Sequence, residues 1–182
     1  VAALARSMAD GDAAVAQAAV QALGKLGLAS AMQALKPGLG KCPKVAQAYL
    51  VGAKTIALKN SSKAAELFAE IRACKQNVCP AVRLAAARGE MLSAGKQGLQ
   101  LWSEMITSAD ESTSDTALRV VLDFPSDRKA TAVFAGELVV PLAKMPDTQA
   151  KLALVLGKRG DTAAVPALAA LADCGSGASC QN

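Results

Sequence analysis

Apolar residues recur at helical spacing along almost the whole chain, and this pattern repeats. Two segments, 63–74 (KAAELFAEIRAC) and 163–174 (AAVPALAALADC), align without a gap and place large apolar residues along one stripe of a helix. A second amphipathic pattern precedes each segment, and its copies start near residues 15, 45, 82, 116 and 150. The starts are thus 30–37 residues apart. A period of this length, with two helical patterns per copy, predicts stacked helical hairpins.

Capping and helix-breaking residues set the bounds of the predicted helices. Polar residues just ahead of a helical pattern are predicted N-caps: Asp12, Ser30, Ser62, Ser114 and Asp161. Glycines that follow a pattern, at 27 and 160, are predicted to end helices. After a short helix that ends near residue 9, the expected helix pairs are 13–26 and 30–41, 44–58 and 62–74, 80–94 and 96–108, 114–123 and 127–144, and 147–157 and 162–173.

The composition agrees with an all-α fold. Hydrophobic residues make up 52% of the 182 residues and charged residues 19%, which argues against a disordered chain. Aromatic residues are 3%, and most of the apolar content is Ala and Leu, which favour helices. We therefore expect an α-α superhelix, a solenoid of about five helical hairpins, that makes residues 1–182 a single repeat domain. Because the chain begins with Val1 rather than Met, we expect it to be a fragment of a larger multidomain protein.

The last repeat resembles a known family. Residues 156–173 (LGKRGDTAAVPALAALAD) resemble the HEAT repeat, in the short bacterial form related to phycobilisome-lyase repeats, and Ala22–Gly27 (ALGKLG) is similar to its first part. The copies between them lack the Gly-Asp turn. The resemblance implies a bacterial, right-handed solenoid whose second helices line a concave surface. It also implies packing of Leu156 and Leu168 between the helices of the last hairpin.

The residues give little support to catalysis. The chain contains no His, so the commonest general base and the commonest metal ligand are both missing. No serine has a His or a well-placed Lys paired with it by sequence, and no phosphate-binding loop follows a strand. We therefore expect a protein that is not an enzyme and that needs no cofactor and no metal.

A protein-interaction or scaffold role is the function that this pattern favours. Each repeat would bury its apolar stripe, leaving the polar stripe of the second helices as a ladder of mixed charge that suits a folded protein or a neighbouring domain of the same chain. The residues expected to bind this partner are Lys63, Glu66, Glu70, Arg72, Gln100 and Glu104.

Charge leaves one alternative open. The chain has 20 Lys and Arg against 15 Asp and Glu, a formal charge of +5, and residues 13–65 hold seven lysines without a single acid. A basic half of this kind could bind nucleic acid. Tyr49 is the only aromatic residue in that stretch on which a base could stack, and the second helix of the last pair carries no Lys or Arg. Nucleic acid is therefore the alternative partner.

The five cysteines bear on the compartment. Cys74 and Cys79 flank one polar loop, and Cys174 and Cys180 flank another. This spacing favours two local disulfides, with Cys42 left over, in an oxidising compartment. The predicted location is periplasmic or secreted, and the alternative of buried free thiols would indicate the cytoplasm. No stretch reaches the roughly 18 unbroken apolar residues of a membrane-spanning helix.

Overall fold

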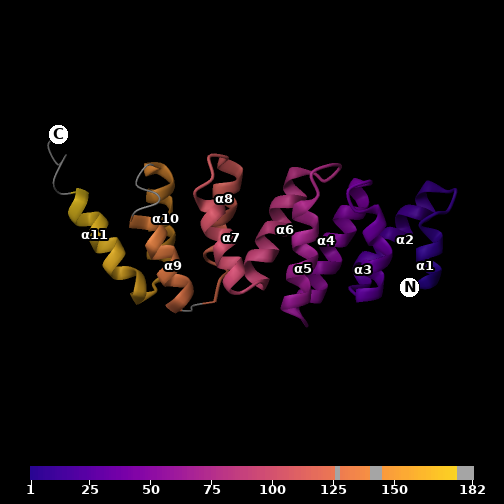
Figure 1. The fold of residues 1–182 in the computed structure, drawn as a ribbon, viewed down its shortest axis with the longest axis horizontal. Coiled ribbons are helices and arrows are strands. Elements are labelled where there is room, and N and C mark those ends of the chain that lie inside the picture. Colours follow the sequence, from indigo (N-terminus) through magenta and orange to yellow (C-terminus); the bar gives the residue numbers. More distant parts are fainter. Residues whose placement is uncertain (126–127, 140–144, 176–182) are drawn as a thin grey trace. The chain divides into compact units, whose positions relative to one another are not determined.

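The chain is mainly helical in the residues that its computed structural model describes, which are 1–125, 128–139 and 145–175. These residues form α-helices and short 3₁₀ turns without any strand (Figure 1). The prediction of an all-α fold is therefore confirmed. The helices fall into two compact units, Val1–Gly95 and Lys96–Asn182.

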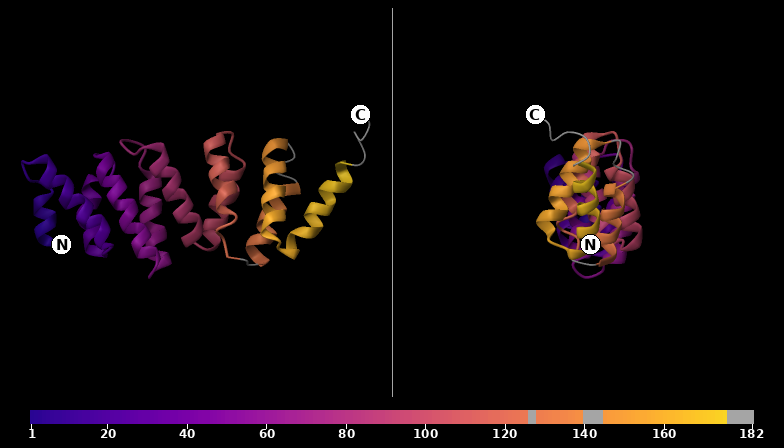
Figure 2. Two further views of the ribbon diagram at one scale, coloured as in Figure 1. Left: turned by 180° about the vertical axis from the view of Figure 1, so that it is seen from behind. Right: turned by 90° about the vertical axis from the view of Figure 1, so that its left-hand side faces the viewer.

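The N-terminal unit consists of six helices joined by short connections (Figures 1 and 2). They are α1 (Ala2–Ser7), α2 (Ala13–Leu26), α3 (Ala29–Leu35), α4 (Pro43–Ala57), α5 (Ser61–Ala73) and α6 (Pro80–Ser93), with a 3₁₀ turn η1 (Lys36–Gly38) after α3. α4 lies at the centre and packs on α2, α5 and α6. α3 packs on α2 and α4, whereas α5 packs on α4 and α6.

Burial of one apolar stripe from each of α2 to α6 holds this unit together. Leu23 of α2, Met32 of α3, Tyr49 of α4 and Phe68 of α5 all have at most 1% of their surface exposed and belong to one continuous core. Each such side chain contributes roughly 1.5–3 kcal/mol by leaving water. The core thus joins the helices of successive hairpins.

The helices α2 and α4 approach each other closely at a glycine. A Cβ atom added at Gly24 would lie 2.5 Å from the backbone oxygen of Ala48. The lysine ammonium of Lys44 on α4 also donates to the side-chain oxygen of Gln17 on α2. Gln17 and Gly24 therefore mark the stripe of α2 that α4 covers.

The C-terminal unit contains α7 (Lys96–Ile106), α8 (Glu111–Val120), α9 (Arg128–Val139), α10 (Pro146–Arg159), the 3₁₀ turn η3 (Thr162–Ala164) and α11 (Val165–Gly175). Three aromatic rings, those of Trp102, Phe124 and Phe134, lie together in its core. The ring of Phe134 lies edge-on to Trp102, with centroids 4.5 Å apart, and edge-on to Phe124 at 5.3 Å. The indole N–H of Trp102 donates to the carbonyl of Ala117 at 2.9 Å, so this large side chain is buried without an unpaired donor. Trp102 is therefore a fully buried core residue of this unit.

A buried arginine completes the C-terminal unit. The side chain of Arg159, at the end of α10, is 4% exposed. Its guanidinium donates to the carbonyl oxygens of Val121, Phe124 and Pro125, at 2.9 Å for Phe124, and also to the carboxylate of Asp161. It lies 5.6 Å from the centroid of the Phe134 ring. Arg159 therefore ties the end of α10 to the chain that follows α8.

Several helix starts differ from the prediction. The cap of α5 is Asn60, whose side chain accepts from the N–H of Lys63 at 2.9 Å, and Ser62 lies inside the helix. Asp110 caps α8 at the N–H of Thr113, so Ser114 is a buried residue within that helix. An amide or carboxylate earlier in the chain thus displaces the predicted serine as the cap.

The predicted caps at 30 and 161 also need correction. Leu28, which has no capping side chain, precedes α3, so Ser30 lies within the first turn. Asp161 precedes η3, but its carboxylate accepts from Thr131 at 2.6 Å and from Arg159 rather than from a helix N–H. These tertiary partners compete successfully with the local cap.

The two glycines that were predicted to end helices do so in the structure. Gly27 and Gly160 both adopt the left-handed conformation that ends a helix, with φ of 56° and 70°. Leu156 is buried as expected, whereas Leu168 is only half-buried. The predicted helix 30–41 ends early, at Leu35, because Pro37 and Gly38 tighten the chain into η1.

Candidate functional site

A groove lies between α3 and α5 in the N-terminal unit. We call it the α3–α5 groove. It encloses about 310 Å³ and is lined by Ala29, Met32, Gln33, Lys36, Pro37, Tyr49, Lys63, Leu67 and Glu70. α3 is short, and both α3 and α5 pack on α4. As a result, a side chain of α4 forms the floor between them.

The floor of the groove is apolar and its rim is polar. Met32, Tyr49 and Leu67 are all buried, and Pro37 and Ala29 extend the apolar lining toward α3. Gln33, Lys36 and Lys63 are exposed at the rim. An apolar floor with a few polar groups around it is typical of a binding pocket.

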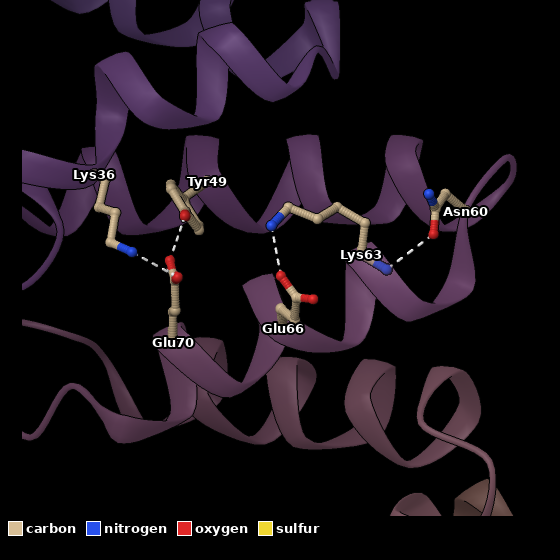
Figure 3. Close-up of polar contacts among 6 residues, drawn as sticks. All are labelled: Lys36, Tyr49, Asn60, Lys63, Glu66 and Glu70. Atoms are coloured by element: carbon tan, nitrogen blue, oxygen red, sulfur yellow. Dashed lines mark hydrogen bonds and ion pairs between the residues drawn. The ribbon is translucent and has the colours of Figure 1, made fainter.

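One carboxylate joins the two sides of the groove. Glu70 of α5 accepts a hydrogen bond from the ammonium of Lys36 at 2.7 Å through Oε1 and another from the hydroxyl of Tyr49 at 2.5 Å through Oε2 (Figure 3). Lys36 follows α3 and Tyr49 lies on α4. Glu70 therefore connects residues from α5, α4 and the end of α3.

A second ion pair lies nearer the start of α5. The ammonium of Lys63 contacts Oε2 of Glu66 at 2.5 Å, and its backbone N–H donates to the cap Asn60 (Figure 3). Hydrogen bonding and attraction by Glu66 raise the pKa of Lys63 above its ordinary value. The lysine thus stays cationic at neutral pH, and both members of the pair are well exposed.

The environment shifts the pKa values of Glu70 and Tyr49 in opposite directions. Burial alone would raise the pKa of the Glu70 carboxyl, but hydrogen bonds from Lys36 and Tyr49 outweigh burial and hold it below 4.5. Burial, and then the hydrogen bond to Glu70, raise the pKa of Tyr49 well above its ordinary value of 10. At neutral pH the site therefore holds an ionised Glu70 and a protonated Tyr49.

The single tyrosine of the chain allows this arrangement to be tested. We expect no tyrosinate absorbance near 295 nm until the pH is well above 10, and we expect Glu70→Gln to lower the pKa of Tyr49 because the neighbouring negative charge is removed. The pKa of Tyr49 is higher in the folded state than in the unfolded state, so the protonated phenol favours folding. We expect this stabilisation to be lost as the pH rises above 10 and Tyr49 ionises. Helical circular dichroism, recorded in parallel, separates titration from unfolding.

The matched control for this titration is Glu66→Gln, which removes a carboxylate from the same helix but not from Tyr49. It should leave the tyrosine pKa unchanged. Ionisation of Tyr49 near pH 10 in the folded wild-type chain would contradict the buried, hydrogen-bonded phenol.

The structure brings together half of the residues that were expected to bind a partner. Lys63, Glu66 and Glu70 lie along α5, where Lys63 and Glu70 line the groove and Glu66 pairs with Lys63 (Figure 3). Arg72 contacts Glu90 of α6 instead, at 2.7 Å from Nε and 3.0 Å from Nη2, because it lies on the side of α5 that faces α6. The charge of Arg72 is thus paired with Glu90 within the N-terminal unit.

The other two expected residues, Gln100 and Glu104, are exposed on α7, in the C-terminal unit. Conversely, the sequence pattern did not indicate Lys36, Tyr49 and Gln33 as site residues. Tyr49 is at helical spacing within an apolar stripe, which indicated core, and Lys36 was one lysine among seven. The Pro-Gly break after Lys36 was the one signal of an opening beside α3.

The predicted disulfide between Cys74 and Cys79 is wrong in this structure, where Cys42, Cys74 and Cys79 are all free. Cys74 is partly buried at the end of α5 and packs on the core, with its sulfur 3.7 Å from where a Cβ of Gly40 would lie. Cys79, just before α6, is exposed. The two thiols therefore lie in different surroundings. The second predicted pair, Cys174 and Cys180, lies outside the side chains that the structure describes, so the oxidising compartment stays a prediction.

The C-terminal unit has a larger pocket, of about 690 Å³. It is lined by Arg128, Thr131, Ala132, Asp161, Thr162, Ala163 and Pro166. The carboxylate of Asp161 already accepts hydrogen bonds from Thr131 and Arg159, and these bonds hold the pKa of Asp161 below its ordinary value.

No cluster of metal-ligating side chains occurs among the described residues. Nor is any described helix long and apolar enough to cross a membrane.

Comparison with protein-family models and with curated proteins gives no match for this chain. The resemblance to the HEAT repeat therefore stays a prediction.

Proposed function

We propose that this chain is a non-catalytic interaction module, a HEAT-like solenoid that binds a partner protein or a neighbouring domain of the same chain. The single observation that carries the proposal is the α3–α5 groove, with its apolar floor and its charged rim. The groove lies between α3 and α5, which would be the second helices of two successive hairpins in such a solenoid, and these helices line the binding surface of a helical-repeat protein.

The chemistry of the groove suits binding better than catalysis. A general base or acid works best when its pKa lies near the operating pH. Here the pKa of Glu70 is lowered and that of Tyr49 is raised, so both move away from neutrality. Both groups are also hydrogen-bonded to each other. They support the wall of the groove and are poorly placed to transfer a proton.

The rim and the floor would serve different purposes in a complex. Buried apolar contacts at the centre of an interface supply most of the binding energy, while charged groups at its edge direct association and select the partner. Met32, Leu67 and the ring of Tyr49 offer the first kind of contact, and Lys36 and Lys63 offer the second.

Site-specific photocrosslinking tests the proposal. A photoreactive amino acid at Gln33, which is exposed and lines the groove, should give a discrete crosslinked product in an extract of the cells that make the protein. The matched control is the same amino acid at Lys54, an exposed residue of α4 outside the groove lining, which should give little of that product. Equal yield from both positions, or no product from Gln33, would contradict a partner in the groove.

Charge supports one other candidate, nucleic acid. Residues 1–95 hold twelve Lys and Arg against five Asp and Glu, a formal charge of +7. Glu70 in the groove lining, and Glu66 paired with Lys63 one turn earlier on α5, oppose a phosphate chain. A phosphate-driven complex would weaken steeply between 50 mM and 200 mM salt, so DNA binding measured across that range separates the two candidates.

A further inference from the structure

We propose that the α3–α5 groove recognises an acidic peptide segment in which Asp or Glu lies next to an aliphatic side chain. This inference rests on the proposed interaction function and names the class of partner. In the complex, the aliphatic side chain enters the floor of the groove, and the carboxylate lies between the ammonium groups of Lys36 and Lys63.

The size of the groove sets the scale of the ligand. Its volume of about 310 Å³ is at the lower end of the range of roughly 300–1,000 Å³ found for ligand pockets. A space of this size accepts one or two side chains of an extended peptide. The ligand is therefore a short segment, with the rest of the partner outside the groove.

The floor selects an aliphatic side chain. Met32 and Leu67 are buried at 1% and 4% exposure, and Met32 is flexible enough to adapt to different shapes. The polar end of Tyr49 is already used, because its hydroxyl donates to Glu70. A polar ligand side chain would have no partner at this depth and would lose its hydration.

The rim selects a negative charge. Each lysine ammonium has three N–H donors, and the ion pairs in the structure use one from Lys36 and one from Lys63. Glu70 holds Lys36 at the groove, where the remaining donors can bind a ligand oxygen. The pair of Lys63 with Glu66 is exposed, and pairs of this kind contribute little to stability, so a ligand carboxylate can share or replace Glu66 at small cost.

The charge of the N-terminal unit favours the same ligand. Its formal charge of +7 attracts acidic segments over a distance of about 8–10 Å at ordinary salt. Residues 13–65, which contribute most of the groove lining, contain no Asp or Glu. The acid in the groove lining is Glu70 of α5, which is already paired with Lys36 and Tyr49.

Selection from a random dodecapeptide library displayed on phage tests the inference with the full chain. The wild-type protein should enrich peptides in which Asp or Glu is next to Leu, Ile, Val or Met. The double variant Lys36→Gln/Lys63→Gln should not enrich them. Enrichment of basic peptides, the same enrichment by wild type and double variant, or no enrichment would each overturn the assignment.

Binding constants for one enriched peptide provide the quantitative test. By fluorescence anisotropy, Lys36→Gln/Lys63→Gln should weaken binding at least tenfold, and a peptide with Gln in place of its acid should lose a similar factor. The matched control Lys54→Gln/Lys59→Gln removes the same charge from exposed lysines outside the groove and should change binding less than twofold. Equal losses from both double variants would indicate general attraction to a basic surface and would overturn the groove assignment.

Two further outcomes distinguish failure of the interaction function from failure of the acidic-peptide assignment. If no acidic peptide binds but the crosslinker at Gln33 still captures a discrete partner, the interaction function stands and only the peptide class fails. If a single-stranded oligonucleotide displaces the enriched peptide and binds equally well to Lys36→Gln/Lys63→Gln, the basic surface binds polyanions and the inference is wrong.

Discussion

Arg159→Met is expected to lower the free energy of unfolding by about 3–5 kcal/mol, the range observed when one partner of a buried charged contact is removed. The guanidinium is 4% exposed and serves three backbone carbonyls that follow α8. Methionine replaces the length of the side chain but none of its donors, so the carbonyls of the buried residues Val121 and Phe124 lose this partner. Urea unfolding of the full chain measures the loss.

The neighbour of Arg159 provides the control. Lys158→Met removes the same charge from the same helix turn but from an exposed side chain, and should change stability by less than about 0.5 kcal/mol. Arg159→Lys should recover only part of the loss, because one ammonium cannot reproduce the planar fork of donors. Wild-type stability for Arg159→Met would contradict the buried hydrogen-bond network.

Gly24→Ala is expected to destabilise the protein by about 1–3 kcal/mol, the usual cost of overpacking, despite a gain in helix propensity of up to about 1 kcal/mol. The new Cβ would lie 2.5 Å from the backbone oxygen of Ala48, and a backbone atom cannot move aside as a flexible side chain can. The substitution must therefore force α2 and α4 apart. Thermal unfolding followed by circular dichroism measures this effect.

Gly157→Ala is the matched control, since Gly157 occupies the same place in the related sequence near the end of α10. Among the described residues, nothing lies within 4 Å of a Cβ at this position. The propensity gain is then unopposed, and we expect the protein to become more stable by about 0.5–1 kcal/mol. Stabilisation by both substitutions would mean that α2 and α4 do not pack as closely as described.

The helices could be predicted from the sequence because their signals are local. The bounds of α2 match the prediction because Asp12 caps its start and Gly27 takes a positive φ at its end. Where a prediction failed, a competing local or tertiary group decided the outcome. Asn60 displaced Ser62 as a cap, and Asp161 bonds to Thr131 and Arg159 instead of capping the next turn.

The candidate site was only partly predictable because its contacts join residues that are far apart in the chain. Spacing along α5 identified Lys63, Glu66 and Glu70 as one face. The partners of Glu70 are 34 residues away at Lys36 and 21 residues away at Tyr49, and no local pattern links them. Arg159 shows the same limit, since a basic residue at a helix end is usually solvated, whereas this one is buried under Phe134 and the end of α8.

The placement of Tyr49 and Trp102 gives each unit its own optical reporter. These are the only tyrosine and the only tryptophan, and they are buried in the N-terminal and C-terminal units respectively. Tyrosine absorbance therefore follows the loss of packing around α4, while tryptophan emission excited at 295 nm follows the aromatic cluster of Trp102, Phe124 and Phe134. Coincident transitions would mean that the two units unfold as one cooperative domain. Separate transitions would mean that the α3–α5 groove belongs to a part of the chain with a stability of its own.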